Sequence, residues 1–124
     1  MSENTPKVVI WYEHYCQAAI ALFVAGSFSG LYGVFARASL AARFEVDSVA
    51  IALFGTLWLL TMLFLAFVHY AALKTPREDW AWKIHAIVLG IGMTTLVLWP
   101  AALPLLWYWF KPETKAFYGV EVTA

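Results

Sequence analysis

The sequence predicts an all-α integral membrane protein with three transmembrane helices, of which the second and third form a tight hairpin. Of its 124 residues, 63% are hydrophobic and 13% charged, and the mean hydropathy is +0.72. Polar side chains are therefore too few to cover a water-soluble domain of this size. Three long runs without charge each reach the roughly 20 residues that cross about 30 Å of hydrocarbon. They predict spans over residues 14–36, 48–73 and 84–110 in a single membrane domain, residues 1–124, with short polar tails at both ends.

The first run, residues 14–36, carries small residues at a spacing of four, in the pairs Gly26 with Gly30 and Ser29 with Gly33. Gly26, Gly30 and Gly33 belong to a face on which a neighbouring backbone can approach closely. We therefore predict that these three glycines pack against another helix, either of this chain or of a second subunit. The segment before the run lacks the basic start and the cleavage site of a secretory signal, so we expect it to stay in the mature chain.

Two connections join the three runs. The first, residues 37–47, is of mixed composition, and for it we expect a plain linker or a brief interfacial helix. The second is a charged turn between the second and third runs. Asp47 then supplies an N-cap signal for the second span. That span ends before Pro76, because the residue before a proline avoids helical geometry. The turn over residues 74–79 cannot lie in lipid, so the third span must begin again after it.

The third run contains two prolines, Pro100 and Pro104. Each removes a backbone donor and crowds the carbonyl one turn earlier, so the third helix should bend there. Aromatic residues mark both ends of this run, with Trp82 expected at one membrane surface and residues 107–109 at the other. Three crossings would place the termini on opposite sides of a multi-pass protein, for which we expect a bacterial inner membrane. The lysines and arginines are then divided equally between the two membrane surfaces, with Lys7, Lys74, Arg77 and Lys83 at one and Arg37, Arg43, Lys111 and Lys115 at the other. This equal division leaves the orientation undetermined.

Charge and cysteine content restrict the function classes. The formal net charge is zero, so no basic field points to nucleic acid. Cys16 is the only cysteine and offers no internal disulfide, no CxxC pair and no thiolate zinc site. The partners we expect are the lipid bilayer and other membrane-protein subunits.

Two histidines flank the charged turn at nearly the same depth. His69 comes about one turn before it and His85 shortly after it, and His14 should face the same surface. Ionisable groups in or near a span are costly and often functional. The pair could therefore hold haem b or a chlorin at its metal. Two other interpretations compete with this one: a quinone pocket near the interface, and a copper or zinc site. The quinone pocket would use His69, Tyr70, Trp80 and Trp82, and the metal site would use Glu13, His14, Cys16, His69 and His85. The alternative to all three is that His69 bonds a backbone carbonyl or reaches the head groups while the others face water.

The spans lack the groups that an independent enzyme or pump needs. They contain no Asp, Glu, Lys or Arg, and no glycine-rich phosphate loop is present. The predicted architecture, although none of the motifs, is similar to that of the membrane anchors of succinate and fumarate dehydrogenases. We therefore expect a small accessory or anchor subunit of a larger electron-transfer complex that is not catalytic on its own. It would stabilise the complex by helix packing and contribute to a haem, chlorin or quinone site. The alternative is a free-standing, oligomeric small-molecule carrier.

Overall fold

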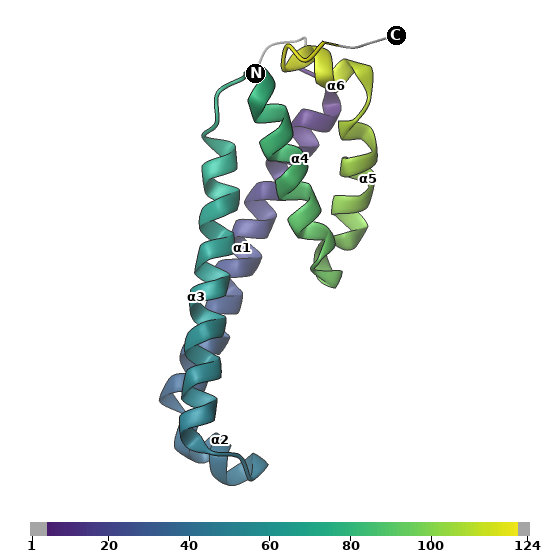
Figure 1. The fold of residues 1–124 in the computed structure, drawn as a ribbon. Helices are drawn as coiled ribbons and strands as arrows, with labels where there is room; N and C mark the ends of the chain where they lie inside the picture. The colour runs from purple at the N-terminus through teal and green to yellow at the C-terminus, as the bar shows by residue number, and fades with distance from the viewer. Residues whose placement is uncertain (1–4, 122–124) are drawn as a thin grey trace. The chain divides into compact units, whose positions relative to one another are not determined.

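The structure is a computed structural model that describes residues 5–121, all of whose regular elements are helices (Figure 1). The first four and last three residues of the predicted polar tails lie outside the described residues. The elements are α1 (Lys7–Phe35), α2 (Arg37–Phe44), α3 (Ser48–Leu73), α4 (Asp79–Met93), the 3₁₀-helix η1 (Leu96–Leu98), α5 (Trp99–Trp109) and α6 (Pro112–Phe117).

The helices have the lengths and composition of a membrane protein. Two of them, α1 and α3, are long and apolar enough to cross a bilayer, and α4 with α5 would add a third crossing only if the pair formed one span. The all-helical membrane class is thus confirmed, with two or three candidate spans. The bounds of α3 coincide with the predicted 48–73, whereas α1 begins at Lys7 rather than at residue 14.

Local signals explain how α3 begins. The backbone N–H of Val49 donates to the Asp47 carboxylate over 2.7 Å, which confirms the predicted N-cap. Before it, α2 is the brief helix that we considered beside a plain linker. It ends where Glu45 takes a left-handed conformation, with φ of 55°, and where the N–H of Val46 donates to Ala41 over 3.2 Å. This Schellman-like end satisfies a late carbonyl of α2 and turns the chain toward α3.

The third predicted span differs from the expectation of one helix bent at its prolines. It consists of α4 and of η1 continued by α5, and the two arms are bent by 114° across residues 94–95, before Pro100. Pro100 lies in the first turn of α5, where its missing N–H has no helical partner to lose, so it starts a new helix instead of kinking an old one. Pro104 lies inside α5 without ending it. At the break, Thr94 donates its hydroxyl to the Ile91 carbonyl over 2.6 Å.

Two tryptophans join the far ends of this helix pair. The indole N–H of Trp82 donates to the carbonyl of Trp109 over 3.0 Å, and that of Trp109 donates to the carbonyl of Trp82 over 3.1 Å. In one straight helix these residues would lie about 40 Å apart, at about 1.5 Å per residue. The chain therefore reverses direction, as Figure 1 shows for α4 and α5. The expectation that Trp82 and Trp109 mark opposite surfaces is wrong, because the reversal brings them together.

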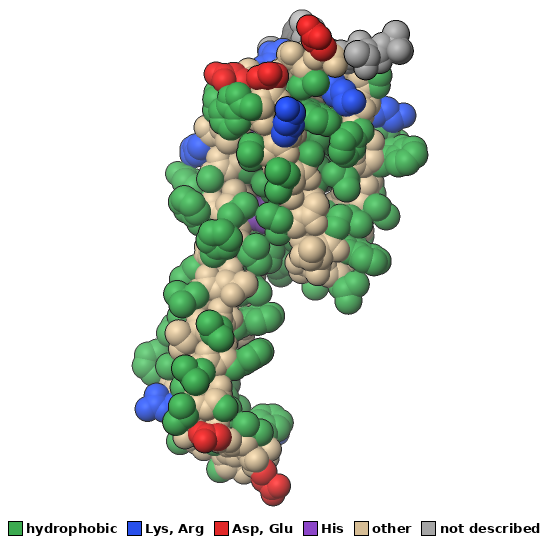
Figure 2. Space-filling model, viewed as in Figure 1, with side chains coloured by type: hydrophobic (Ala, Val, Ile, Leu, Met, Phe, Trp, Pro, Cys, Tyr) green, Lys and Arg blue, Asp and Glu red, His purple; other side chains and the backbone are tan. Residues whose placement is uncertain are grey.

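The chain divides into two compact units. The hairpin unit comprises residues 1–19 and 69–124. Residues 20–68 form the other unit, called the two-helix unit after its two long helices α1 and α3, and they also include the short α2. On the face in Figure 2, apolar side chains cover each unit; charged side chains gather near α2 in the two-helix unit, and near α6 and the α3–α4 connection in the hairpin unit. In the hairpin unit, Arg77 of that connection lies 3.8 Å from the ring centre of Phe117 in α6 and donates to its carbonyl. The end of α6 is thus tied to the α3–α4 connection.

Candidate functional site

His85 of α4 has a hydrogen-bond partner at each of its two ring nitrogens. The side chain is buried, with 3% of its surface exposed. Its Nδ1 lies 2.9 Å from the hydroxyl of Tyr12 in α1, and its Nε2 lies 3.0 Å from the hydroxyl of Thr75 after α3. One imidazole therefore joins three segments that are distant in the sequence.

The direction of these hydrogen bonds follows from Thr75. Its hydroxyl has one proton, which it donates to the carbonyl of Ala72 over 2.7 Å. The Thr75 oxygen must then accept from Nε2–H of His85, so Nδ1 is the acceptor and Tyr12 donates to it. The ring is neutral in this arrangement, with both nitrogens in use. An axial ligand to haem or a donor to a quinone would have to give up one of these bonds.

Aromatic rings enclose the imidazole of His85. The ring centres of Tyr12, Trp109 and Tyr118 lie 4.8, 5.6 and 5.4 Å from its own. Burial raises the pKa of the Tyr118 phenol well above its usual range, with smaller contributions from Glu13 and Cys16, so this ring stays neutral. Edge-on and tilted contacts of this kind stabilise the pairing beyond the area they bury. The cluster fastens the first turns of α1 to α4, α5 and α6.

His69 of α3 is a second fully enclosed histidine of the hairpin unit. None of its surface is exposed, and its ring centre lies 6.0 Å from that of Tyr15. The Tyr15 hydroxyl is buried and has no hydrogen-bond partner within the described residues. It lies against Gly92 of α4, where an added Cβ would fall 3.1 Å from the Cζ of Tyr15 and nearer still to the oxygen. The missing side chain at Gly92 therefore makes room for the Tyr15 ring.

The four predicted cofactor residues, His69, His85, Tyr70 and Trp82, differ in exposure and in their contacts. His69 and His85 are buried, whereas Tyr70 is 52% exposed and lies beneath the Lys74 ammonium. Trp82 uses its indole N–H in the bond to Trp109. The remaining member of the proposed quinone pocket, Trp80, is exposed and donates to the Glu78 carboxylate.

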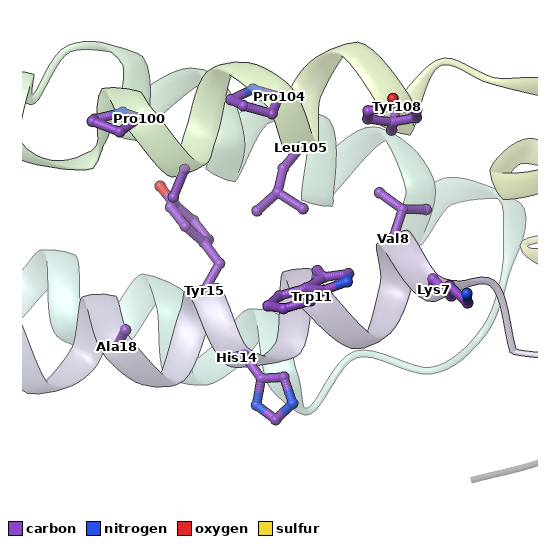
Figure 3. Close-up of a pocket in the computed structure, with 11 residues that line it drawn as sticks. Lys7, Val8, Trp11, His14, Tyr15, Ala18, Pro100, Pro104, Leu105 and Tyr108 are labelled. Carbon is purple, nitrogen blue, oxygen red and sulfur yellow. The ribbon is translucent and has the colours of Figure 1, made fainter.

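The predicted metal ligands are also dispersed. No three His, Cys, Asp or Glu side chains between residues 5 and 121 lie together as a metal site would need. His14 is exposed, and its ring points away from α5 in Figure 3, whereas Cys16 is fully buried.

The glycines of α1 meet α3 inside the two-helix unit. A Cβ added at Gly30 would fall 2.6 Å from the carbonyl oxygen of Gly55 and 2.8 Å from the backbone nitrogen of Leu59. The neighbours of Gly26 and Gly33 are less restrictive: Met62 Sδ at 3.2 Å and Gly55 Cα at 3.7 Å. Of the two partners considered for this face, the chain's own helix is the one in contact.

Trp58 of α3 adds a hydrogen bond across this crossing. Its indole N–H lies 3.1 Å from the Gly26 carbonyl and 3.0 Å from the Ser29 hydroxyl. Close backbone approach and a shared indole donor are the means by which helices hold together in lipid. The crossing therefore has a structural explanation within this chain.

A groove between α1 and α5 was not predicted. Its volume is about 580 Å³, and Figure 3 shows Tyr15 reaching from α1 toward α5 and Leu105 pointing from α5 toward α1, with Trp11 lying along α1. The groove was missed because the sequence places α5 in a third crossing and not beside the start of α1. A spacing of four between Trp11 and Tyr15 puts them on one helix face, but local pattern does not identify what that face meets.

Comparison of the chain with protein-family models, with curated proteins and with solved structures gave no match. Its function is therefore argued from the geometry above.

Proposed function

We propose that the chain is a small, non-catalytic accessory subunit of a larger membrane complex, of the electron-transfer kind, and that it acts by helix packing. One observation carries the proposal: buried polar side chains of the hairpin unit are used to join its helices. Both ring nitrogens of His85 are bonded to neighbouring segments, and Trp82 and Trp109 bond each other's backbone. Groups used in this way rigidify the unit and specify one arrangement of its helices.

The outer surfaces are suited to lipid and to partner helices. Large apolar side chains stand exposed along both helices of the two-helix unit, among them Phe28, Tyr32, Phe35, Phe54, Leu57 and Phe64. Because lipid tails are as apolar as these side chains, moving the side chains from lipid to a partner helix yields little free energy by itself. Binding of a partner helix is therefore stabilised by close packing of the two surfaces.

Isolation of the native protein tests this function. After extraction in mild detergent, we expect larger membrane subunits to copurify with the chain, at a fixed ratio through two separation steps. A homo-oligomer without such subunits would refute the proposal and favour the carrier. A reduced-minus-oxidised absorption spectrum of the isolated chain should show no haem or chlorin band that depends on His85, because both nitrogens of that ring are hydrogen-bonded. A haem band that is lost in His85→Leu would contradict this part of the proposal.

The membrane topology that we propose has two crossings, α1 and α3, followed by a re-entrant hairpin of α4 and α5. The lengths support it, since α4 is about 22 Å long and α5 about 16 Å at about 1.5 Å per residue, each short of about 30 Å of hydrocarbon. The bend of 114° and the Trp82–Trp109 pair return the chain to the side from which it entered. Both termini then lie on one side, and not on opposite sides.

This topology also yields an orientation. Six cationic residues now share the side of the termini, Lys7, Lys74, Arg77, Lys83, Lys111 and Lys115, against Arg37 and Arg43 on the other. The positive-inside rule assigns the six to the cytoplasm of a bacterial inner membrane. Alkaline phosphatase, which is active only outside the cytoplasm, should therefore be inactive when fused at the C-terminus and active when fused after Phe44. Activity at the C-terminus would show that the hairpin crosses.

A further inference from the structure

The groove between α1 and α5 has a lysine at one end, and apart from His14 the rest of its lining is apolar or aromatic. Its walls are formed mainly by Val8, Trp11, Tyr15, Pro100, Pro104 and Leu105. Lys7 lines one end, at the first residue of α1, and Ala18 lines the other. The distance along α1 between these two residues is about 16 Å at about 1.5 Å per residue. The groove is therefore long enough for much of one extended acyl chain.

A second cation stands near the same end. Tyr108 of α5 lines the groove, and the Lys111 ammonium lies 5.5 Å from the centre of its ring. Figure 3 shows Tyr108 and Lys7 at one end of the groove, with Pro100 and Ala18 at the other. No carboxylate is among the residues that line it within the described chain. The polar end therefore favours an anion, and the rest favours hydrocarbon.

We propose that this groove binds an anionic glycerophospholipid, with its phosphate near Lys7 and Lys111 and one acyl chain along α1 and α5. Three features support this ligand over a partner helix: the charge at one end, the apolar walls, and the amphipathic rings of Trp11 and Tyr108 between them. Trp and Tyr are enriched at the level of the head groups, and a lysine near a membrane surface attracts anionic lipid by about 1 kcal/mol. The proposal rests on the membrane topology above, which puts both lysines at the same surface.

Native mass spectrometry of the full chain tests the site. The protein in detergent is supplied with phosphatidylglycerol and phosphatidylcholine in equal amounts, and the lipid that stays bound is identified by mass. We expect one phosphatidylglycerol to be retained in preference to phosphatidylcholine. Lys7→Gln with Lys111→Gln should reduce that preference about thirtyfold, as the loss of two such attractions implies. Lys74→Gln with Lys83→Gln, the same charge change elsewhere in the hairpin unit, should leave it unchanged.

A second variant separates the groove from its charged end. Ala101 lines the groove and is exposed, so Ala101→Trp should fill it without disturbing the core and should prevent retention of either lipid. Equal retention of both lipids by the wild type, equal losses in the two lysine pairs, or full retention in Ala101→Trp would each overturn the proposal. A dimer that Ala101→Trp dissociates would assign the groove to a second copy instead. Copurification with larger subunits does not depend on this result, so failure of the lipid site is distinguishable from failure of the proposed function.

Discussion

Two tyrosines of α1 allow the role of the His85 network to be measured with one chemical change. Tyr12 and Tyr15 are both buried in the hairpin unit, and each becomes phenylalanine by loss of a single oxygen. The Tyr12 hydroxyl donates to Nδ1 of His85 over 2.9 Å. The Tyr15 hydroxyl has no hydrogen-bond partner in the described structure. Tyr15→Phe is therefore the matched control for Tyr12→Phe.

The two substitutions should have different effects on the free energy of unfolding. Tyr12→Phe leaves Nδ1 of His85 buried without its donor, which costs about 1–3 kcal/mol. Tyr15→Phe removes a buried hydroxyl that gains nothing from the protein, so the free energy of unfolding should stay the same or rise by about 1 kcal/mol. In a His85→Leu background, Tyr12→Phe should cost much less than in the wild type, because the acceptor is already gone.

Reversible unfolding in mixed micelles, followed by far-UV circular dichroism, gives the free energy of each variant. The expected order of stability is Tyr15→Phe at or above wild type, and Tyr12→Phe below it. Equal losses in the two variants would refute the reasoning, since only one of the two hydroxyls is bonded. An unchanged cost of Tyr12→Phe in the His85→Leu background would show that the loss does not pass through the imidazole.

Two glycine pairs give further predictions. Gly92→Ala places a methyl group against the Tyr15 ring and should lower the free energy of unfolding by about 1–3 kcal/mol. At Gly90 an added methyl group meets open space, so Gly90→Ala should be neutral or mildly stabilising. Similar melting temperatures for the two variants would contradict the packing described. Gly30→Ala meets backbone atoms, which cannot move aside as a flexible side chain can, and should lower thermal stability by a similar amount, while Gly33→Ala should be tolerated. If Gly30→Ala melts with the wild type, the close crossing of α1 and α3 is wrong.

The features that the sequence predicted well are local ones. Composition and run length identify a helical membrane protein, and the bounds of α3 follow from the Asp47 cap at one end and the charged turn at the other. Hydropathy reports how apolar a segment is but not whether the chain reverses its direction within it. Residues 84–110 were therefore predicted to be one crossing. Their reversal depends on the pairing of Trp82 with Trp109, which no local pattern reports.

The candidate site divides in the same way. The sequence marked His69, the deepest of the three histidines, as the one most in need of an explanation, because burying an imidazole is costly, and it left His85 free to face water. The structure buries both rings, and the partners of His85, Tyr12 and Thr75, come from other segments of the chain. Since the reversal of α4 and α5 forms this enclosure, a prediction of three crossings could not find it.

Cysteine labelling in intact cells reports directly on whether the α4–α5 hairpin returns to its own side of the membrane. Ala116→Cys in α6 and Ser39→Cys in α2 each add one exposed thiol, and the wild type, whose Cys16 is fully buried, serves as the background. With two crossings and a re-entrant hairpin, a membrane-impermeant maleimide should label residue 39 in intact cells, and residue 116 only after permeabilisation. Labelling of both positions from outside would mean that α4 and α5 together cross the membrane, and the topology, with the orientation drawn from it, would be wrong.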